Sequence, residues 1–435
     1  MLVTRASYDW AFADDIPGSR CDPEDGPWPR AYRVLDDASL WRELSALAKP
    51  QSKLFDPARG FKADSLNFQP CPRTRTQDRY VVRQLNVHGR TWTFTGVFDG
   101  HLGDVTVEHV SHHLPIIVRE FLEGHFEPNS EQKFTPEAIS DLFTNAISAF
   151  DDAIAQDVLG LFGGSMEGVA RYSDSEIRQI INDQHAGGAN WRKARLCMYG
   201  TTALVALVDP DHTSLWLAQL GDCQATLVTF DEKTNTWNTD VLTREQNGDN
   251  DAEIARVQKE HPGEAECVVD RRVLGALAPF RCLGDIPFKQ PPEFSRRILY
   301  NLLPGFHDTG PWEEFLVRNK SPPYISAIPE ITYRRLAPRA LGSIAPPRYL
   351  ILSSDGFADL CNGTSQAHVI TAWARKMESI PPMSPVDPAI KSNNMALRLL
   401  REALGGDDHC SVSRVLTLDM ESAWIDDTSI VVQTL

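Results

Sequence analysis

The segment VFDGHLGD, residues 97–104, is the most informative stretch of this sequence for both the fold and its chemistry. The residues before it have the pattern of a strand and those after it the spacing of a helix, so it forms a strand-to-helix junction. A carboxylate at Asp99 can bridge metal ions, and the carbonyl of Gly100 can approach a metal because no side chain covers it. His101 is a candidate proton donor. Taken alone, an Asp-Gly pair is equally typical of an ordinary turn.

Acidic residues recur at the predicted ends of other strands. They occur in LGD (220–222), SSDGFAD (353–359), IDDTSI (425–430) and RTRTQD (73–78), which contain Asp222, Asp355, Asp359, Asp426 and Asp78. A turn or a cap explains each of them singly, but five acidic strand ends in one sheet protein are harder to explain that way. Mg²⁺ and similar hard cations prefer oxygen ligands, and two ions ~3.5–4 Å apart would be bridged by one carboxylate. The pattern therefore indicates a divalent metal site.

Strands and helices are grouped in runs instead of alternating, which favours the α+β class with antiparallel sheets. Strands are predicted at 79–87, 91–98, 201–208, 214–220, 224–230, 236–242, 330–335, 348–353 and 428–433. The four strands from 201 to 242 have short connections, so we expect one meander of hairpins. Helices are predicted at 38–48, 104–123, 135–159, 251–260, 312–318, 368–377 and 389–403.

The domain organisation follows from the distribution of these elements. Residues 1–50 contain scattered Pro and Asp and no strand pattern, so we interpret them as an N-terminal extension of the domain at 51–435. Two segments of that domain have the composition of insertions. Residues 160–196 are polar, with one short helix expected at 174–182, and residues 286–328 are rich in Pro and Gly and are expected to form a long loop.

The composition excludes several classes of protein. The 435 residues include 43 Lys and Arg against 59 Asp and Glu, for a net charge of −16. This charge argues against nucleic-acid binding and against docking on anionic membranes.

No apolar run approaches the ~20 residues that span a bilayer. The first residues lack an apolar signal region and include early acids, unlike a mitochondrial transit peptide. The eight cysteines contain no C-x-x-C pair and are expected to be reduced thiols. We expect a cytoplasmic monomer.

The order of the motifs resembles that of the metal-dependent protein serine/threonine phosphatases of the type 2C (PPM) class, from about residue 70 onward. The resemblance rests on R-x-x-x-Q-D (73–78), V-F-D-G-H-x-G (97–103), Y-G-T-T-A (199–203), L-G-D-C-Q (220–224), L-T-x-x-Q-N (242–247), R-C-L-G-D (281–285), S-S-D-G-F-A-D (353–359) and D-D-T-S (426–429). Within that class, the chain is most similar to the pyruvate dehydrogenase phosphatase branch, on segments 246–247, 253–263, 272–275, 279–281, 322–324 and 329–333.

This resemblance implies a four-layer fold of two packed antiparallel β-sheets flanked by helices on both sides. It implies hydrolysis of phosphoserine or phosphothreonine with two Mg²⁺ or Mn²⁺ ions and a weaker third metal site, and pyruvate dehydrogenase or a related phosphoprotein as a candidate substrate. For the two main ions, the resemblance implies Asp99 as the bridge, the Gly100 carbonyl, Asp355 and Asp426 as further ligands, and Asp78 as the holder of a metal-bound water. For the third site it implies Asp222, Asp355 and Asp359. It also implies Arg73 as the phosphate-binding residue and His101 as the general acid.

One residue departs from the family pattern. Gln77 stands where the family usually has Glu, which removes a negative charge beside the metals and puts metal affinity in question. A catalytically weak, phosphatase-like binding or regulatory protein is therefore the alternative to an active phosphatase, and a hydrolase of small phosphorylated molecules is a third hypothesis. The branch resemblance also implies the mitochondrial matrix as an alternative to the cytoplasm.

Overall fold

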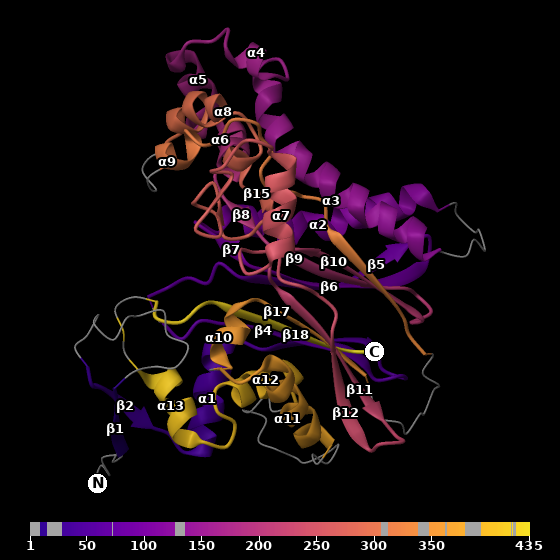
Figure 1. Ribbon diagram of the computed structural model, residues 1–435. Helices are drawn as coiled ribbons and strands as arrows, with labels where there is room; N and C mark the ends of the chain where they lie inside the picture. Colours follow the sequence, from indigo (N-terminus) through magenta and orange to yellow (C-terminus); the bar gives the residue numbers. More distant parts are fainter. Residues whose placement is uncertain are drawn as a thin grey trace. The chain divides into compact units, whose positions relative to one another are not determined.

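The computed structural model describes residues 9–14, 28–71, 73–126, 135–305, 312–337, 348–361, 363–378, 393–418, 420 and 423–435 (Figure 1). The chain divides into two compact units. Unit 1 consists of Met1–Val82, Gln224–Leu242 and Arg339–Leu435, and unit 2 of Arg83–Cys223 and Thr243–Pro338. Each unit contains antiparallel strands and helices, which confirms the α+β class. The packing of two sheets in four layers stays a prediction.

Unit 1 contains a six-stranded sheet in the order β12-β11-β17-β18-β4-β3. Its strands are β3 (Gln51–Asp56), β4 (Phe61–Phe68), β11 (Gln224–Asp231), β12 (Thr236–Val241), β17 (Tyr349–Ser353) and β18 (Thr428–Thr434). Every pairing in it is antiparallel. The predicted strands at 224–230, 236–242, 348–353 and 428–433 are confirmed, whereas β3 and β4 were not anticipated.

Helices cover one face of this sheet (Figure 1). They are α1 (Asp37–Ala48), α10 (Gly356–Leu360), α11 (Gln366–Glu378), α12 (Met395–Ala403) and α13 (His409–Thr417). Leu40 of α1, Trp373 of α11 and Leu397 of α12 share one hydrophobic core with Leu66 and Ile430 of the sheet. The predicted helix at 38–48 is confirmed by α1, where the Asp36 side chain caps the first turn by accepting from Ser39 N at 2.7 Å.

The expectation that residues 1–50 contain no strand is wrong. Strands β1 (Asp9–Ala13) and β2 (Arg30–Val34) form an antiparallel pair. The chain after β2 is held to α13, because Leu35 N donates to Ser413 Oγ at 2.9 Å. The residues around β2 and α1 therefore contribute to the core of unit 1. The domain boundary near residue 50 stays a prediction.

Unit 2 contains a five-stranded sheet in the order β16-β10-β9-β6-β5. The strands are β5 (Arg79–Val87), β6 (Arg90–Phe98), β9 (Ala203–Val208), β10 (Ser214–Leu220) and β16 (Glu330–Arg335), and helices α2 (Val105–His125) and α3 (Pro136–Leu159) pack on it (Figure 1). Phe94 of β6 meets Phe143 of α3 edge to face at 6.5 Å. A smaller sheet, β15-β8-β7, is formed by β7 (Gly100–His101), β8 (Gly200–Thr201) and β15 (Leu283–Gly284).

The predicted single meander at 201–242 is wrong, although its four strands exist. The hairpin β9–β10 belongs to the sheet of unit 2 and the hairpin β11–β12 to the sheet of unit 1. The chain changes sheet at Gly221, Asp222 and Cys223, where Gly221 has a positive φ of 97°. The short connection at 221–223 predicted a hairpin between β10 and β11. Instead, it joins a strand of one sheet to a strand of the other.

The two predicted insertions contain more helix than expected. In unit 2, α4 (Met166–Val169), α5 (Asp174–Ile181), α6 (Ala189–Leu196), α8 (Pro292–Arg297) and α9 (Trp312–Leu316) form a group, together with α7 (Asp251–Glu260) nearby (Figure 1). The segments hold each other, since Asn182 Nδ2 donates to Asn301 O at 2.9 Å and Arg297 pairs with Asp174 at 2.9 Å. Such short helices depend on contacts that are distant in sequence, so local patterns miss them.

The expectations about membrane spans and cysteines can be compared with the described residues. Among the helices that the structure describes, none is long and apolar enough to cross a membrane. Seven of the eight cysteines lie in the described ranges and all seven are free thiols, while Cys21 lies outside those ranges.

Candidate active site

Unit 2 positions the DGH motif at the end of β6. The Asp99 backbone is held on both sides by the β8 region, because Asp99 N donates to Thr202 Oγ1 at 3.2 Å and Thr202 N donates to Asp99 O at 2.9 Å. Gly100 and His101 then form β7, which pairs with Thr201 and Gly200. The motif is therefore a short strand that continues into the loop before α2, and its geometry is set by β8.

The small sheet brings His101 beside Asp285. Strand β8 pairs with β7 on one side and with β15 on the other, so Asp285, which directly follows β15, lies across β8 from His101. His101 Nε2 lies 2.6 Å from Asp285 Oδ2. A Cβ atom at Gly200 would lie 1.9 Å from the same oxygen, so only glycine leaves room for this carboxylate. Asp285 itself is 1% exposed and has a left-handed φ of 48°.

This carboxylate determines the protonation of His101. Burial alone would lower the pKa of the imidazole, but the charge and hydrogen bond of Asp285, together with the charge of Asp222, raise the pKa of His101 above its usual 6.5. Cys282 Sγ donates to the same Asp285 oxygen at 3.0 Å. The arrangement keeps His101 in the proton-donating form, as its expected role as a general acid requires.

Asp222 lies in the turn after β10 in the same unit. Its Oδ2 accepts from Asn247 Nδ2 at 3.0 Å. Gly221 N donates to Gln246 Oε1 at 3.0 Å, which fixes the turn. A Cβ atom at Gly221 would lie 2.5 Å from the Thr202 side chain, whose backbone binds Asp99. Asp99, His101 and Asp222 therefore lie around Thr202 and the small sheet.

Unit 1 brings a second group of acids to one edge of its sheet. The register pairs Ser353 with Ile430 and Thr428 with Phe68, so the end of β17, the start of β18 and the end of β4 meet there. Asp355 follows β17 as the first residue before α10, Asp359 lies within α10, and Asp426 precedes β18. Asp78 precedes β5, and its carbonyl accepts from Asn67 Nδ2 of β4 at 2.9 Å.

The environment of Asp78 fits a cation. Burial, opposed by hydrogen bonds from Ser354 and Ser429 and reinforced by the charges of Asp427 and Asp355, raises the pKa of Asp78 to about 8. Asp78 Oδ2 is buried and has no hydrogen-bond partner in the part of the chain that the structure describes. A buried unpaired oxygen beside other carboxylates is costly, and a divalent cation with oxygen ligands would satisfy it. The chemistry of these oxygen donors therefore suits Mg²⁺ or Mn²⁺.

Asp427 and Gln77 are the sequence neighbours of the predicted ligands Asp426 and Asp78, and they are hydrogen-bonded to each other. Asp427 acts as a structural acceptor, because Gln69 Nε2 donates to its Oδ1 at 2.7 Å and Gln77 N donates to its Oδ2 at 2.6 Å. Gln77 Oε1 is buried and has no hydrogen-bond partner among the described residues. The backbone hydrogen bond to Asp427 thus holds Gln77 at the acidic edge of unit 1.

The predicted site residues are divided between the units. Asp99, Gly100, His101 and Asp222 belong to unit 2, whereas Arg73, Asp78, Asp355, Asp359 and Asp426 belong to unit 1. Arg73 is exposed in the loop before β5. Within the described ranges, no group of three His, Cys, Asp or Glu residues is arranged so that it could hold a metal ion. The roles of these residues therefore stay predictions.

Sequence reasoning missed the partner of His101. Asp285 was visible as the last residue of the R-C-L-G-D motif, yet that motif by itself indicated no role. The pairing of Asp427 with Gln69 and Gln77 was likewise not anticipated. The His101–Asp285 contact and the Asp427 hydrogen bonds join residues far apart in the chain. Of the signals in the sequence, only the order of the motifs could have suggested these contacts.

Comparison with known proteins assigns the chain to a protein family. The family model of protein phosphatase 2C matches residues 167–404, and the chain belongs to that family. It is 28% identical over 273 residues to human mitochondrial pyruvate dehydrogenase (acetyl-transferring) phosphatase 1, an alignment covering 56% of this chain and 49% of that protein. It therefore spans about half the length of that relative.

Two other relatives align over more of their length. Human mitochondrial pyruvate dehydrogenase (acetyl-transferring) phosphatase 2 is 28% identical over 395 residues, which cover 78% of this chain and 71% of that protein. A protein phosphatase 2C homologue of Schizosaccharomyces pombe is 26% identical over 382 residues, covering 83% and 77% respectively. These similarities agree with the resemblance to the pyruvate dehydrogenase phosphatase branch.

Proposed function

We propose that this chain is a Mg²⁺- or Mn²⁺-dependent protein phosphatase that hydrolyses phosphoserine and phosphothreonine. The observation that carries the proposal is the buried Asp78 carboxylate, which is crowded by the charges of Asp427 and Asp355 and whose Oδ2 finds no hydrogen-bond partner among the residues described. Such crowding is stable at neutral pH only if the carboxylate keeps a proton or a cation is bound. Membership of the protein phosphatase 2C family supports the second alternative.

The proposed ligands are all oxygen donors. Asp78, Asp99, the Gly100 carbonyl, Asp355 and Asp426 would hold two ions, and a weaker third site would use Asp222, Asp355 and Asp359. When bound, the ions would lower the pKa of water so that a hydroxide nucleophile exists at neutral pH. Oxygen ligands of this kind suit Mg²⁺ and Mn²⁺ better than softer metals.

The remaining chemistry falls to Arg73 and His101. The bond from the attacking oxygen to phosphorus forms while the bond from phosphorus to the seryl or threonyl oxygen breaks. In the proposed mechanism, the Arg73 guanidinium binds the phosphoryl oxygens with its fork of N–H donors. His101 gives its proton to the leaving oxygen, and Asp285 keeps it protonated until that step. No phosphoenzyme is needed, so no nucleophilic cysteine or serine is assigned.

The substrate and location are proposed from the relatives. Two of them are named as mitochondrial phosphatases of pyruvate dehydrogenase, so we propose a phosphorylated subunit of that enzyme, or a related phosphoprotein, as substrate. The same names favour the mitochondrial matrix, and they do not support the cytoplasmic location expected from the N-terminal composition.

The test compares two aspartates of unit 2 in the purified protein. Asp99→Asn should reduce metal-dependent dephosphorylation of a phosphoserine peptide by about a hundredfold or more, because the bridging charge is lost. The matched control is Asp211→Asn, an exposed residue paired with Arg90, which should keep wild-type activity. A wild-type rate for Asp99→Asn would refute the mechanism. A folded wild-type protein without metal-dependent hydrolysis would favour the phosphatase-like binding protein instead.

A further inference from the structure

Leu102 directly follows the proposed general acid and combines an unfavourable backbone conformation with an exposed side chain. Its φ of 63° lies in the left-handed region, and the residue is 49% exposed. Among the residues that the structure describes, Leu274 is the other aliphatic residue with a left-handed φ, and it is fully buried. Burial in the core thus accounts for Leu274, whereas it does not account for Leu102.

The backbone of Leu102 is strained because the residue has a side chain. In the left-handed conformation, the Cβ atom of an L-amino acid comes too close to the following carbonyl oxygen. Single exposed leucines are common on protein surfaces, but exposure alone does not explain a leucine in this conformation. Backbone strain of this kind concentrates at active sites and ligand clamps. The strain at Leu102 therefore points to a role of its side chain in binding.

The chain is fixed on both sides of Leu102. His101 belongs to β7, which pairs with β8, and its ring is held by Asp285 at 2.6 Å. A Cβ atom at Gly103 would lie 3.1 Å from the Tyr199 ring, so the absence of a side chain lets the loop rest on this buried ring. Leu102 is thus presented to solvent from a rigid base.

The position of Leu102 limits what its side chain can contact in a substrate. The side chain of His101 is 24% exposed, so an oxygen that receives its proton approaches from the solvent side. Consecutive Cα atoms are about 3.8 Å apart in the protein and in a substrate peptide alike. A side chain one residue from the general acid therefore reaches the residues directly beside the phosphorylated one.

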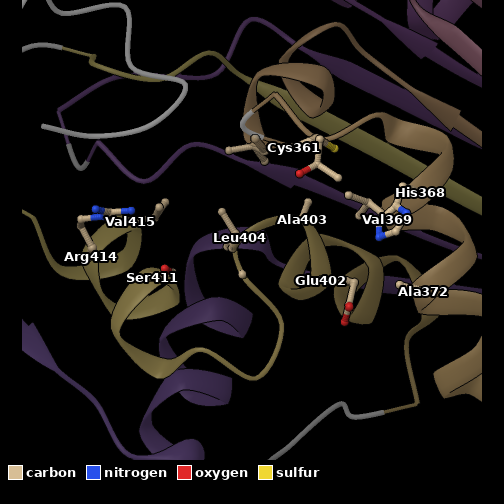
Figure 2. A pocket seen from close by; sticks show the side chains of 13 residues that line it. Cys361, His368, Val369, Ala372, Glu402, Ala403, Leu404, Ser411, Arg414 and Val415 are labelled. Atoms are coloured by element: carbon tan, nitrogen blue, oxygen red, sulfur yellow. The ribbon is translucent and has the colours of Figure 1, made fainter.

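A cavity in unit 1 has no such relation to the general acid. It measures about 340 Å³ and lies among α10, α11, α12 and α13, with His368, Leu404 and Arg414 around it (Figure 2). No residue proposed for catalysis or metal binding lines it. Nothing in its lining therefore ties it to the phosphorylated residue of a substrate.

We propose that Leu102 selects substrates with an apolar side chain directly beside the phosphorylated residue. An apolar neighbour would cover the exposed leucine and remove its surface from water, whereas a polar neighbour would lose part of its hydration there. This inference rests on the proposed function, because it takes His101 as the general acid. It narrows the substrate class to phosphoproteins with an apolar residue at one of the two adjacent positions.

The test measures kcat/KM of the purified full chain with Mn²⁺ on three phosphoserine heptapeptides. The peptides differ only at the two positions beside the phosphoserine, which carry leucine before it, leucine after it or no leucine, with asparagine at every other varied position. In the wild type, at least one leucine peptide should react about fivefold or more faster than the asparagine peptide, as partial burial of two leucine side chains predicts. The reference substrate is p-nitrophenyl phosphate, which has no neighbouring residues.

Leu102→Asn removes the apolar surface and keeps a residue that tolerates a left-handed backbone. In this variant, the ratio of kcat/KM between the leucine and asparagine peptides should fall to within about twofold of unity, and a general loss of rate cancels in this ratio. Leu102→Met keeps an apolar side chain of similar volume and should keep the preference for leucine. The matched control is Val317→Asn, at an apolar residue of unit 2 that is 63% exposed, and it should also keep the preference.

The outcomes distinguish this inference from the proposed function. A wild type that hydrolyses p-nitrophenyl phosphate and all three peptides without a preference for leucine would overturn the inference alone. A preference that persists in Leu102→Asn, or that is lost equally in Val317→Asn, would also overturn it. A folded wild type that hydrolyses neither the peptides nor p-nitrophenyl phosphate with Mn²⁺ would refute the proposed function and the inference with it.

Discussion

His101 Nε2 and Asp285 Oδ2 lie 2.6 Å apart, although 184 residues separate them in the sequence. The pair exists because β8 lies between β7 and β15 and holds one residue of the pair on each side. An imidazole beside a buried carboxylate stays protonated to a higher pH than a free one. Asp285 is therefore a positioning residue that also sets the charge of the proposed general acid.

Replacing Asp285 by Asn should shift the alkaline limb of the pH–rate profile to lower pH. The Asp285 charge raises the pKa of His101, so without it the proton is lost at lower pH. Asparagine keeps a similar shape and tolerates the left-handed backbone at this position. The measurement is kcat against pH with a phosphoserine peptide.

The control for this prediction is p-nitrophenyl phosphate, whose leaving group needs little protonation. Its pH–rate profile should change far less in Asp285→Asn than that of the peptide. Equal shifts with both substrates would mean that Asp285 acts through the metals or the fold and not through His101.

Gln77→Glu should lower the Mg²⁺ or Mn²⁺ concentration needed for half-maximal rate. The Gln77 side-chain oxygen is buried with no hydrogen-bond partner in the described ranges, and the Gln77 backbone N donates to Asp427 at the acidic edge of unit 1. A carboxylate there adds an oxygen ligand with charge. Gln84→Glu, which adds the same charge at an exposed position of β5, is the control and should leave the metal titration unchanged. An unchanged titration for Gln77→Glu would separate Gln77 from the metal site.

The metal-free protein should lose stability as the pH rises toward 8. Burial raises the pKa of Asp78 in the folded state from its usual 3.8 to about 8, so the unfolded chain releases this proton at a lower pH. The free energy of unfolding should therefore fall between about pH 4 and about pH 8, by at most ~1.4 kcal/mol per pH unit from this group. Chemical denaturation in the presence of a chelator measures this slope.

Asp78→Asn provides the comparison for that slope, because it removes the titrating group and keeps the shape. The variant should show a flatter dependence of unfolding free energy on pH than the wild type. Adding Mn²⁺ should stabilise the wild type above about pH 7, since a cation replaces the proton. A slope that is the same in both proteins would place the titrating group elsewhere.

Leu102→Gly should stabilise the fold by about 1 kcal/mol. Leu102 has a left-handed φ of 63°, which is unfavourable for a residue with a side chain, and it is 49% exposed, so little packing is lost. Leu274 has a similar φ of 51° but is fully buried. Leu274→Gly should therefore destabilise the fold by ~2–5 kcal/mol. Urea denaturation of both variants measures the contrast, and a loss of stability in Leu102→Gly would contradict the argument.

Elements with strong local patterns could be predicted from the sequence, and elements set by distant contacts could not. The strands β5 and β6, rich in Val, Tyr, Trp and Phe, and the long helix α3 lie where their composition and spacing predict them. Strand β4 was missed because its sequence FKADSLNF contains polar residues that are buried in the fold. Asp64, for example, is fully buried, pairs with Lys62 and accepts from Met395 N at 2.8 Å.

The same division holds for the candidate site. The acidic strand ends were readable because each carries its own turn signal, as in the LGD and SSDGFAD segments. The partners of those residues were not readable, because Asp285 meets His101 and Gln69 meets Asp427 only through the sheet. Local sequence thus identifies candidate ligands, whereas hydrogen-bond partners require the pairing of the strands.

Strand β18 lies between β17 and β4, with β4 from the first part of the chain on one side and β17 on the other. During translation, β4 therefore leaves the ribosome long before its neighbour has been made. Until residue 434 has emerged, β4 keeps an unpaired edge, and such an edge can pair with another chain. The sheet of unit 1 can therefore be completed only after β18 has been made.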